Sequence, residues 1–206
     1  SWGSEMCIRD SPYRYGEPGF ELACRIVRAK LPKKEFFEVT AMVETIRRYI
    51  DPEAPVFDCC SGHGLLGMLL GCDERVPRVT LLDRSLPPNC ARLLGTLETS
   101  HPDLRPRVEC VETDLEHYTG FRPGAFVASH ACGPATDLIL EAAVRNQARF
   151  FVMTCCITRK VAERYGLDSV RGREQEINAI RLERAALAGY SVTTLHIDAR
   201  LSLIHI

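Results

Sequence analysis

Short apolar runs rich in β-branched residues alternate along the chain with longer runs whose apolar residues recur at helical spacing. The stretch 34–50 has apolar side chains at positions 36, 39, 42, 43, 46 and 50, which is the pattern of one buried helical face. Strands are expected at 54–60, 78–84, 107–114, 124–132, 149–156 and 190–198, and helices at 34–50, 64–71, 86–99, 134–148 and 173–189. This alternation predicts an α/β fold with a doubly wound, mostly parallel sheet.

The length of 206 residues suits one α/β domain with a sizeable core. We expect an irregular N-terminal segment over residues 1–33 and one domain over residues 34–206. The chain does not begin with Met, and its last six residues, 201–206, read LSLIHI. Because these letters match a reading frame through an adapter used in sequencing libraries, we expect the natural chain to continue past about Arg200.

The charges are nearly balanced, with 26 Lys and Arg against 27 Asp and Glu. Both ends of the sequence are slightly basic and the middle is acidic, which differs from the concentrated basic face that is typical of nucleic-acid binders. RNA is therefore kept as a candidate partner that the charge distribution does not support. No apolar stretch approaches the roughly 20 residues of a membrane span, so no membrane partner is expected.

Ten cysteines are many for a chain of this length, and they include the adjacent pairs Cys59-Cys60 and Cys155-Cys156. Neighbouring cysteines rarely bridge each other, and no C-x-x-C spacing occurs. We interpret the chain as a cytoplasmic protein with buried thiols rather than as a disulfide scaffold.

A small-residue turn follows the first expected strand, in the stretch VFDCCSGHGLLGMLL at 56–70. Gly62 and Gly64 would let a ligand approach the backbone where a strand feeds a helix. The stretch is not a G-x-G-x-x-G fingerprint, because Cys60 stands at the first glycine position and Gly67 comes three residues after Gly64. A plain tight turn is the alternative interpretation of this motif.

An aspartate stands near the end of each of the next two expected strands. A carboxylate at Asp83 can accept hydrogen bonds from both hydroxyls of a ribose, and the alternative is a solvated aspartate at a strand end. Asp114 could accept a hydrogen bond from an adenine amino group, and the alternative is a helix N-cap. Asp58, just before the turn, suits a cationic, amino-acid-bearing cofactor better than a pyrophosphate. The three acids together therefore favour S-adenosyl-L-methionine over a dinucleotide.

These residues resemble the first three motifs of the seven-stranded, Rossmann-like methyltransferases that use S-adenosylmethionine. The stretch SHACGPATDLIL at 129–140, followed by FFVMTCC at 150–156, resembles one subgroup with H-x-C-G-x-A-T-D and Cys-Cys motifs. It includes a domain of glutathione S-transferase C-terminal domain-containing proteins and the 2′-O-methyltransferases of the tRNA acceptor stem. The resemblance implies the strand order 3-2-1-4-5-7-6, with strand seven missing from this chain.

The resemblance also implies site residues. Cofactor contacts are expected from Asp58, Cys60, Ser61, Gly62, His63, Gly64, Asp83, Arg84, Asp114, Leu115 and Ser129. Substrate contacts are expected from Cys132, Gly133 and Cys155. His130, at the end of the fourth strand, is the candidate general base for an acceptor that must lose a proton, and a structural histidine is its alternative. Asp137 is expected to cap or brace the local backbone.

The expected strand order brings cysteines and His130 to one edge of the sheet. They could be small apolar fillers, the lining of a substrate pocket, or zinc ligands, and we assign no metal. Three kinds of methyl acceptor are considered: RNA, a small molecule and a protein side chain. Two other functions are considered: an NAD(P)-dependent oxidoreductase on a similar sheet, and a non-catalytic module that binds the cofactor.

Overall fold

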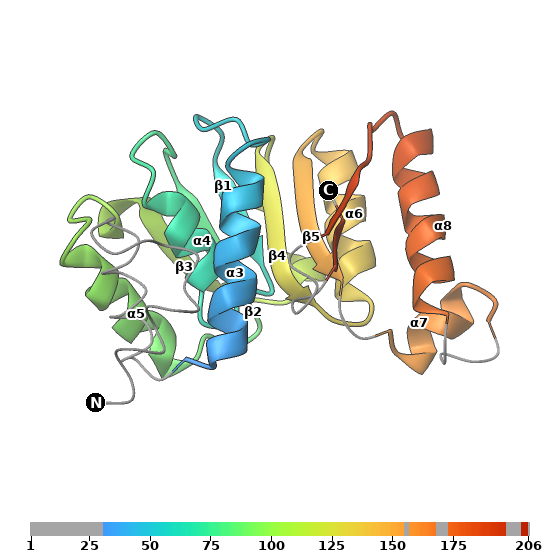
Figure 1. The fold of residues 1–206 in the computed structure, drawn as a ribbon, viewed down its shortest axis with the longest axis horizontal. Coiled ribbons are helices and arrows are strands. Elements are labelled where there is room, and N and C mark those ends of the chain that lie inside the picture. The colour runs from blue at the N-terminus through green and yellow to red at the C-terminus, as the bar shows by residue number, and fades with distance from the viewer. Residues whose placement is uncertain (1–30, 155–156, 168–172, 197–202, 206) are drawn as a thin grey trace.

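The computed structural model describes residues 31–154, 157–167, 173–196 and 203–205. Seven strands form one sheet in the order β3-β2-β1-β4-β5-β7-β6 (Figure 1). The strands are β1 Val56–Cys59, β2 Val79–Asp83, β3 Val108–Glu112, β4 Ala125–Ala131, β5 Arg149–Thr154, β6 Thr194–His196 and β7 Leu203–His205. The first five pair in parallel, and β7 pairs antiparallel with β5 and β6. The strand order reverses between β1 and β4, where ligands bind in open α/β sheets.

Helices cover both faces of this sheet (Figure 1). The α-helices are α3 Lys33–Ile46, α4 Leu65–Gly71, α5 Pro88–Glu98, α6 Ala135–Arg145, α7 Arg159–Arg164 and α8 Glu174–Leu187, and the 3-10 helices are η1 Arg105–Arg107 and η2 Leu115–His117. Among the described residues, no helix is both long and apolar enough to cross a membrane.

Two hydrophobic cores lie on opposite faces of the central strands. In β1, Val56 packs with α3, α4 and α5, whereas the next residue, Phe57, packs with α6 and with Ala185 of α8. Successive side chains of a strand point to opposite faces, and both faces are buried here. This explains why the strands read as continuous apolar runs in the sequence.

The expected strands and helices are present with shorter bounds, and the doubly wound α/β class is confirmed. Sequence periodicity missed α7, because its six residues bury only Val161 and Ala162. The expectation that strand seven is missing was wrong, since the short Leu203–His205 segment pairs between β5 and β6. The segment expected to be irregular lies almost entirely outside the described residues, and α3 begins at Lys33.

Candidate functional site

The turn after β1 lies across the carboxyl end of β2. The backbone N–H of Ser61 donates to the carbonyl oxygen of Leu82 at 3.0 Å, and the backbone N–H of Gly62 donates to Asp83 Oδ2 at 2.9 Å. Cys60 has a φ of 58°, in the left-handed region that favours glycine. The backbone here therefore has the shape of a glycine turn, although a cysteine occupies its first position.

The glycines of the turn have different surroundings. A Cβ added to Gly62 would meet nothing within 4 Å, whereas one added to Gly64 would lie 2.6 Å from Leu81 Cδ1. Gly64 is therefore required for close packing of α4 on the sheet, and Gly62 borders open space. The alternative of a plain tight turn accounts for Gly64 but leaves the open side at Gly62 unexplained.

Asp58 is buried inside the site. Its side chain is 1% exposed, and its Oδ2 accepts the backbone N–H of Gly67 at 2.8 Å. Burial raises the pKa of Asp58 to about 7, the bond from Gly67 opposes this increase, and the charge of Asp83 adds to it. Asp58 Oδ1 and Ser61 Oγ are buried without a hydrogen-bond partner among the described residues. Such atoms cost free energy unless something binds them.

The tips of β2 and β3 hold the other two acids. Asp83 is half-buried, and Asp114 forms an ion pair with Arg84, whose side chain is 83% exposed. Asp114 stands at the N-cap position of η2, as the alternative interpretation expected, but its side chain makes no cap hydrogen bond. Leu115 begins η2 and packs against the core on the α6 side. The three aspartates thus lie at or just beyond the carboxyl ends of three adjacent parallel strands, at one edge of the sheet.

The end of β4 forms the other side of this edge. Ser129 is buried at 8% exposure, and His130 has a side chain that is 39% exposed. The pairing with β5 shifts register between Ala128 and Ala131, so the strand is irregular at these two residues. Gly133 follows with a φ of 60°, and Cys155 lies outside the described residues.

Helix α3 contributes two carboxylates that the sequence analysis missed. Glu35 Oε1 lies 3.2 Å from His63 Nδ1, and Glu38 Oε2 lies 3.8 Å from His130 Nε2. These pairs join α3 to the glycine turn and to the end of β4. The only signal in the sequence is their spacing of three residues, which places both on one side of a helix.

The described cysteines include both free and bonded sulfur atoms. Cys59 and Cys90 are free and buried, Cys60 and Cys72 are free and half-buried, and Cys110 is free and exposed, whereas Cys132 is disulfide-bonded. Burial raises the pKa of Cys60 to about 11, so its thiol stays neutral. In the described part of the chain, no three His, Cys, Asp or Glu side chains gather to hold a metal.

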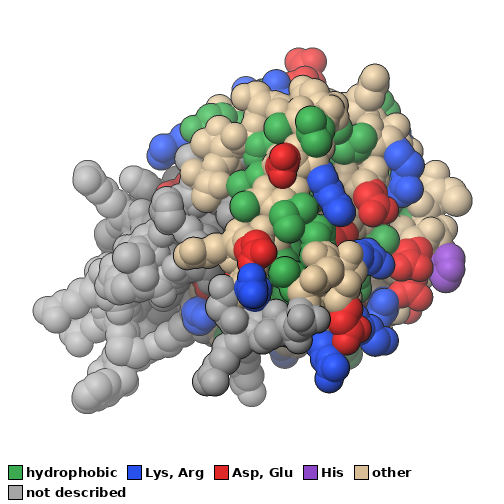
Figure 2. Space-filling view, turned by 90° about the vertical axis from the view of Figure 1, so that its right-hand side faces the viewer, with side chains coloured by type: hydrophobic (Ala, Val, Ile, Leu, Met, Phe, Trp, Pro, Cys, Tyr) green, Lys and Arg blue, Asp and Glu red, His purple; other side chains and the backbone are tan. Residues whose placement is uncertain are grey.

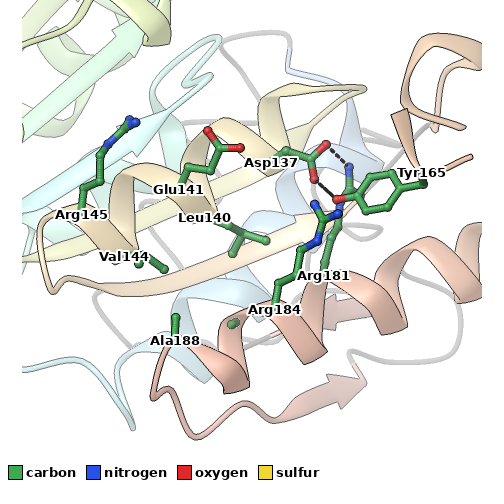
Figure 3. Close-up of a pocket in the computed structure, with 10 residues that line it drawn as sticks. Asp137, Leu140, Glu141, Val144, Arg145, Tyr165, Arg181, Arg184 and Ala188 are labelled. Atoms are coloured by element: carbon green, nitrogen blue, oxygen red, sulfur yellow. Dashed lines mark hydrogen bonds and ion pairs between the residues drawn. The ribbon is translucent and has the colours of Figure 1, made fainter. Parts of the chain in front are cut away.

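Asp137, in the first turn of α6, lines a hollow of about 320 Å³ between α6 and α8 (Figure 3). Arg181 Nε donates to Asp137 Oδ1 at 2.7 Å, and the Tyr165 hydroxyl donates to the same oxygen at 2.7 Å. The expected backbone brace is thus in fact a buried ion pair between two helices. The face that carries α7 and α8 mixes hydrophobic side chains with both signs of charge (Figure 2), without a basic patch.

Comparisons with known proteins agree with this geometry. A family model described as a methyltransferase domain matches residues 33–164. The human glutathione S-transferase C-terminal domain-containing protein is 28% identical over 120 residues, which are 58% of this chain and 18% of that relative. The methyltransferase domain of bacterial CtHen1 has a TM-score of 0.52 and 16% identity, covering 81% of this chain and 95% of that one. An O-methyltransferase family protein from Burkholderia thailandensis has a TM-score of 0.52 and 12% identity, covering 98% and 65%.

Proposed function

Because the chain belongs to the methyltransferase domain family, we propose that the carboxyl ends of β1, β2 and β3 bind S-adenosylmethionine and that the end of β4 receives the methyl acceptor. Membership of this family supports the proposal that the chain is a methyltransferase that uses S-adenosylmethionine. The assignment of individual residues to cofactor and acceptor rests on the geometry of the strand ends.

The observation that carries the proposal is the pair of buried oxygens without partners. Asp58 Oδ1 and Ser61 Oγ both lie at the turn after β1, and Gly62 beside them borders open space. A carboxylate and a hydroxyl can accept and donate hydrogen bonds to an amino-acid group that carries an ammonium and a carboxylate. The methionine end of the cofactor has this chemistry, so the residues present fit it.

Asp83 and Asp114 each keep one carboxylate oxygen for a ligand. Asp83 Oδ2 is held by the N–H of Gly62 at 2.9 Å, and its Oδ1 has a weak contact with the N–H of Ser85 at 3.4 Å. Asp83 Oδ1 is therefore the group that would accept from the ribose hydroxyls. Asp114 pairs with Arg84 through Oδ1, which leaves Oδ2 for the adenine amino group.

When bound, S-adenosylmethionine would supply an electrophilic methyl group, the C–S bond electrons would stay on sulfur, and the acceptor would provide the electron pair for the new bond. The protein has to hold the acceptor in line at about 3 Å and keep water away. His130, at the irregular end of β4, is the group placed to take a proton from a weakly acidic acceptor. Cys132 and Gly133, which follow β4, would line the acceptor side, and the predicted contact of Cys155 lies outside the described residues.

The test is calorimetric titration with S-adenosylhomocysteine and, separately, with NAD. We expect the first to bind and the second not to bind, since Asp58 and Cys60 replace the features that a pyrophosphate requires. Binding of NAD alone would favour the oxidoreductase alternative. Binding of S-adenosylhomocysteine without turnover on RNA, small-molecule and protein acceptors would favour a non-catalytic module. Of the six described cysteines, five are free and Cys132 is disulfide-bonded, and the majority of free thiols supports the proposed cytoplasmic location.

A further inference from the structure

Glu38 is a buried carboxylate that cofactor binding does not use. Its side chain is 2% exposed, and it lies on α3 beside the end of β4. Two nitrogen atoms of basic side chains are near it: Lys34 Nζ is 3.5 Å from Oε1, and His130 Nε2 is 3.8 Å from Oε2. A buried carboxylate costs several kcal/mol unless charged or hydrogen-bonding groups compensate it.

Of these two groups, Lys34 is an exposed partner and His130 lies at the end of β4. The side chain of Lys34 is 72% exposed and lies one helical turn before Glu38, and such pairs are worth a few tenths of a kcal/mol. His130 belongs to the strand end where the acceptor is expected. A carboxylate beside one ring nitrogen of a histidine orients the ring and favours one tautomer.

We propose that Glu38 is the positioning residue of His130: its Oε2, 3.8 Å from Nε2, orients the ring electrostatically so that Nδ1 accepts the proton of the methyl acceptor. This proposal rests on the function proposed above. The O–H bond of the acceptor breaks, the proton moves to Nδ1, and the electron pair stays on the oxygen that becomes methylated. The acceptor atom therefore carries a proton that must leave, as in a hydroxyl group, because an amine without a proton or a thioether needs no base.

The same helix provides a matched control. Glu35 Oε1 lies 3.2 Å from His63 Nδ1, in the turn after β1, and its side chain is 24% exposed. Glu35 and Glu38 thus make the same kind of contact with two different histidines. A change at Glu38 should affect His130 and leave His63 unaffected, and a change at Glu35 should do the reverse.

The experiment measures the rate at which diethyl pyrocarbonate modifies each histidine, with peptide mass spectrometry as the readout. The reagent attacks an imidazole nitrogen that is accessible and carries a lone pair. We expect Glu38→Gln and Glu38→Met to change the rate of modification of His130 by about three- to tenfold, because the ring loses the carboxylate that orients it. Glu38→Asp, which retains the charge, should behave like the natural protein, and Glu35→Gln should change only His63.

Several outcomes would overturn the proposal. An unchanged rate at His130 would show that Glu38 does not orient the ring, and a change in Glu35→Gln of the same size at His130 would show that the effect is not specific to Glu38. If an acceptor found in the panel is a thioether or a tertiary amine, the proton step is excluded. With a hydroxyl acceptor, Glu38→Gln should lower kcat about tenfold and leave the KM for S-adenosylmethionine unchanged. If this variant keeps its affinity for S-adenosylhomocysteine, the cofactor site is intact. An unchanged kcat would then contradict the role of Glu38 without contradicting the proposed function.

Discussion

Asp58 Oδ2 accepts the backbone N–H of Gly67 at 2.8 Å, which ties the buried end of β1 to the first turn of α4. The bond requires the helix backbone to approach the strand closely, because the donor belongs to the main chain. It fixes one oxygen of the carboxylate and leaves Oδ1 without a partner among the described residues. The same contact therefore serves helix packing and the proposed methionine site.

Replacing Gly67 by alanine should disrupt this approach. An added Cβ would lie 2.7 Å from Leu81 Cδ2 and 2.9 Å from Asp58 Cβ. We expect the free energy of unfolding to fall by about 1–3 kcal/mol, as for other overpacked cores, in urea denaturation. Gly95 in α5 is the matched control, since its added Cβ would meet only Arg105 Nη2 at 4.0 Å. Gly95→Ala should raise stability by about 0.5–1 kcal/mol, and equal effects at both sites would contradict the packing argument.

The raised pKa of Asp58 makes stability depend on pH. In the range between its ordinary pKa and the folded value of about 7, the folded protein holds a proton that the unfolded chain has released. Stability is therefore fully present at acidic pH and is lost as the pH rises through this range. Between pH 5.5 and 7.5 the free energy of unfolding should fall by about 2 kcal/mol from this group.

Asp58→Asn should remove this part of the pH dependence, because the amide does not ionise and can still accept the N–H of Gly67. Urea denaturation of both proteins at several pH values is the measurement. Asp103→Asn, at an exposed position, should leave the slope as it is in the natural protein. If the slope persists in Asp58→Asn, the carboxylate of Asp58 does not titrate in this range.

Asp83 links the turn and the proposed ribose site, so two substitutions should separate its roles. Asp83→Asn can still accept the Gly62 N–H but loses the charge, and Asp83→Ala loses both. We expect Asp83→Ala to weaken binding of S-adenosylhomocysteine by about 1–3 kcal/mol and Asp83→Asn to weaken it less. Isothermal titration calorimetry measures both. An affinity equal to that of the natural protein in Asp83→Ala would remove Asp83 from the cofactor site.

Cys60 adopts the backbone conformation of a glycine. Its φ of 58° costs a residue with a side chain about 1 kcal/mol or more, whereas glycine loses more conformational freedom on folding. We expect Cys60→Gly to raise the free energy of unfolding by about 0.5–1 kcal/mol and to keep affinity for S-adenosylhomocysteine. A loss of stability would mean that packing of the Cys60 side chain outweighs the strain of its backbone.

The sequence predicted those parts of the site that lie within a few residues of a strand end. Asp58, Asp83 and Asp114 follow three apolar runs, and parallel strands bring such positions to one edge. Contacts between distant segments left no local signal. Glu38 lies on a helix before the first strand and contacts His130 at the end of β4. Neither the residue type nor the periodicity of the sequence identifies His130 as the partner of Glu38. The short Leu203–His205 strand was missed for a similar reason, because its pairing with β5 and β6 decides its conformation.

The buried pair of Arg181 and Asp137 gives a test of how α6 and α8 are held together. Arg181 donates through Nε and Nη2 to both carboxylate oxygens, at 2.7 and 3.1 Å, and through Nη2 to the Gly133 carbonyl at 3.3 Å. The two side chains are only 4% and 6% exposed. Arg181→Met should therefore lower the free energy of unfolding by about 3–5 kcal/mol, because it leaves a buried carboxylate without its counter-charge.

Arg184 on the same helix is the control for this pair. It is exposed, and its guanidinium carbon lies 4.7 Å from the ring centroid of Tyr165, so Arg184→Met should cost about 1 kcal/mol or less. The double change of Arg181→Met with Asp137→Leu should recover most of the lost stability, since well-packed apolar side chains replace buried ion pairs without large cost. If the single and double variants unfold at the same urea concentration, the loss comes from packing of the arginine rather than from the unpaired charge.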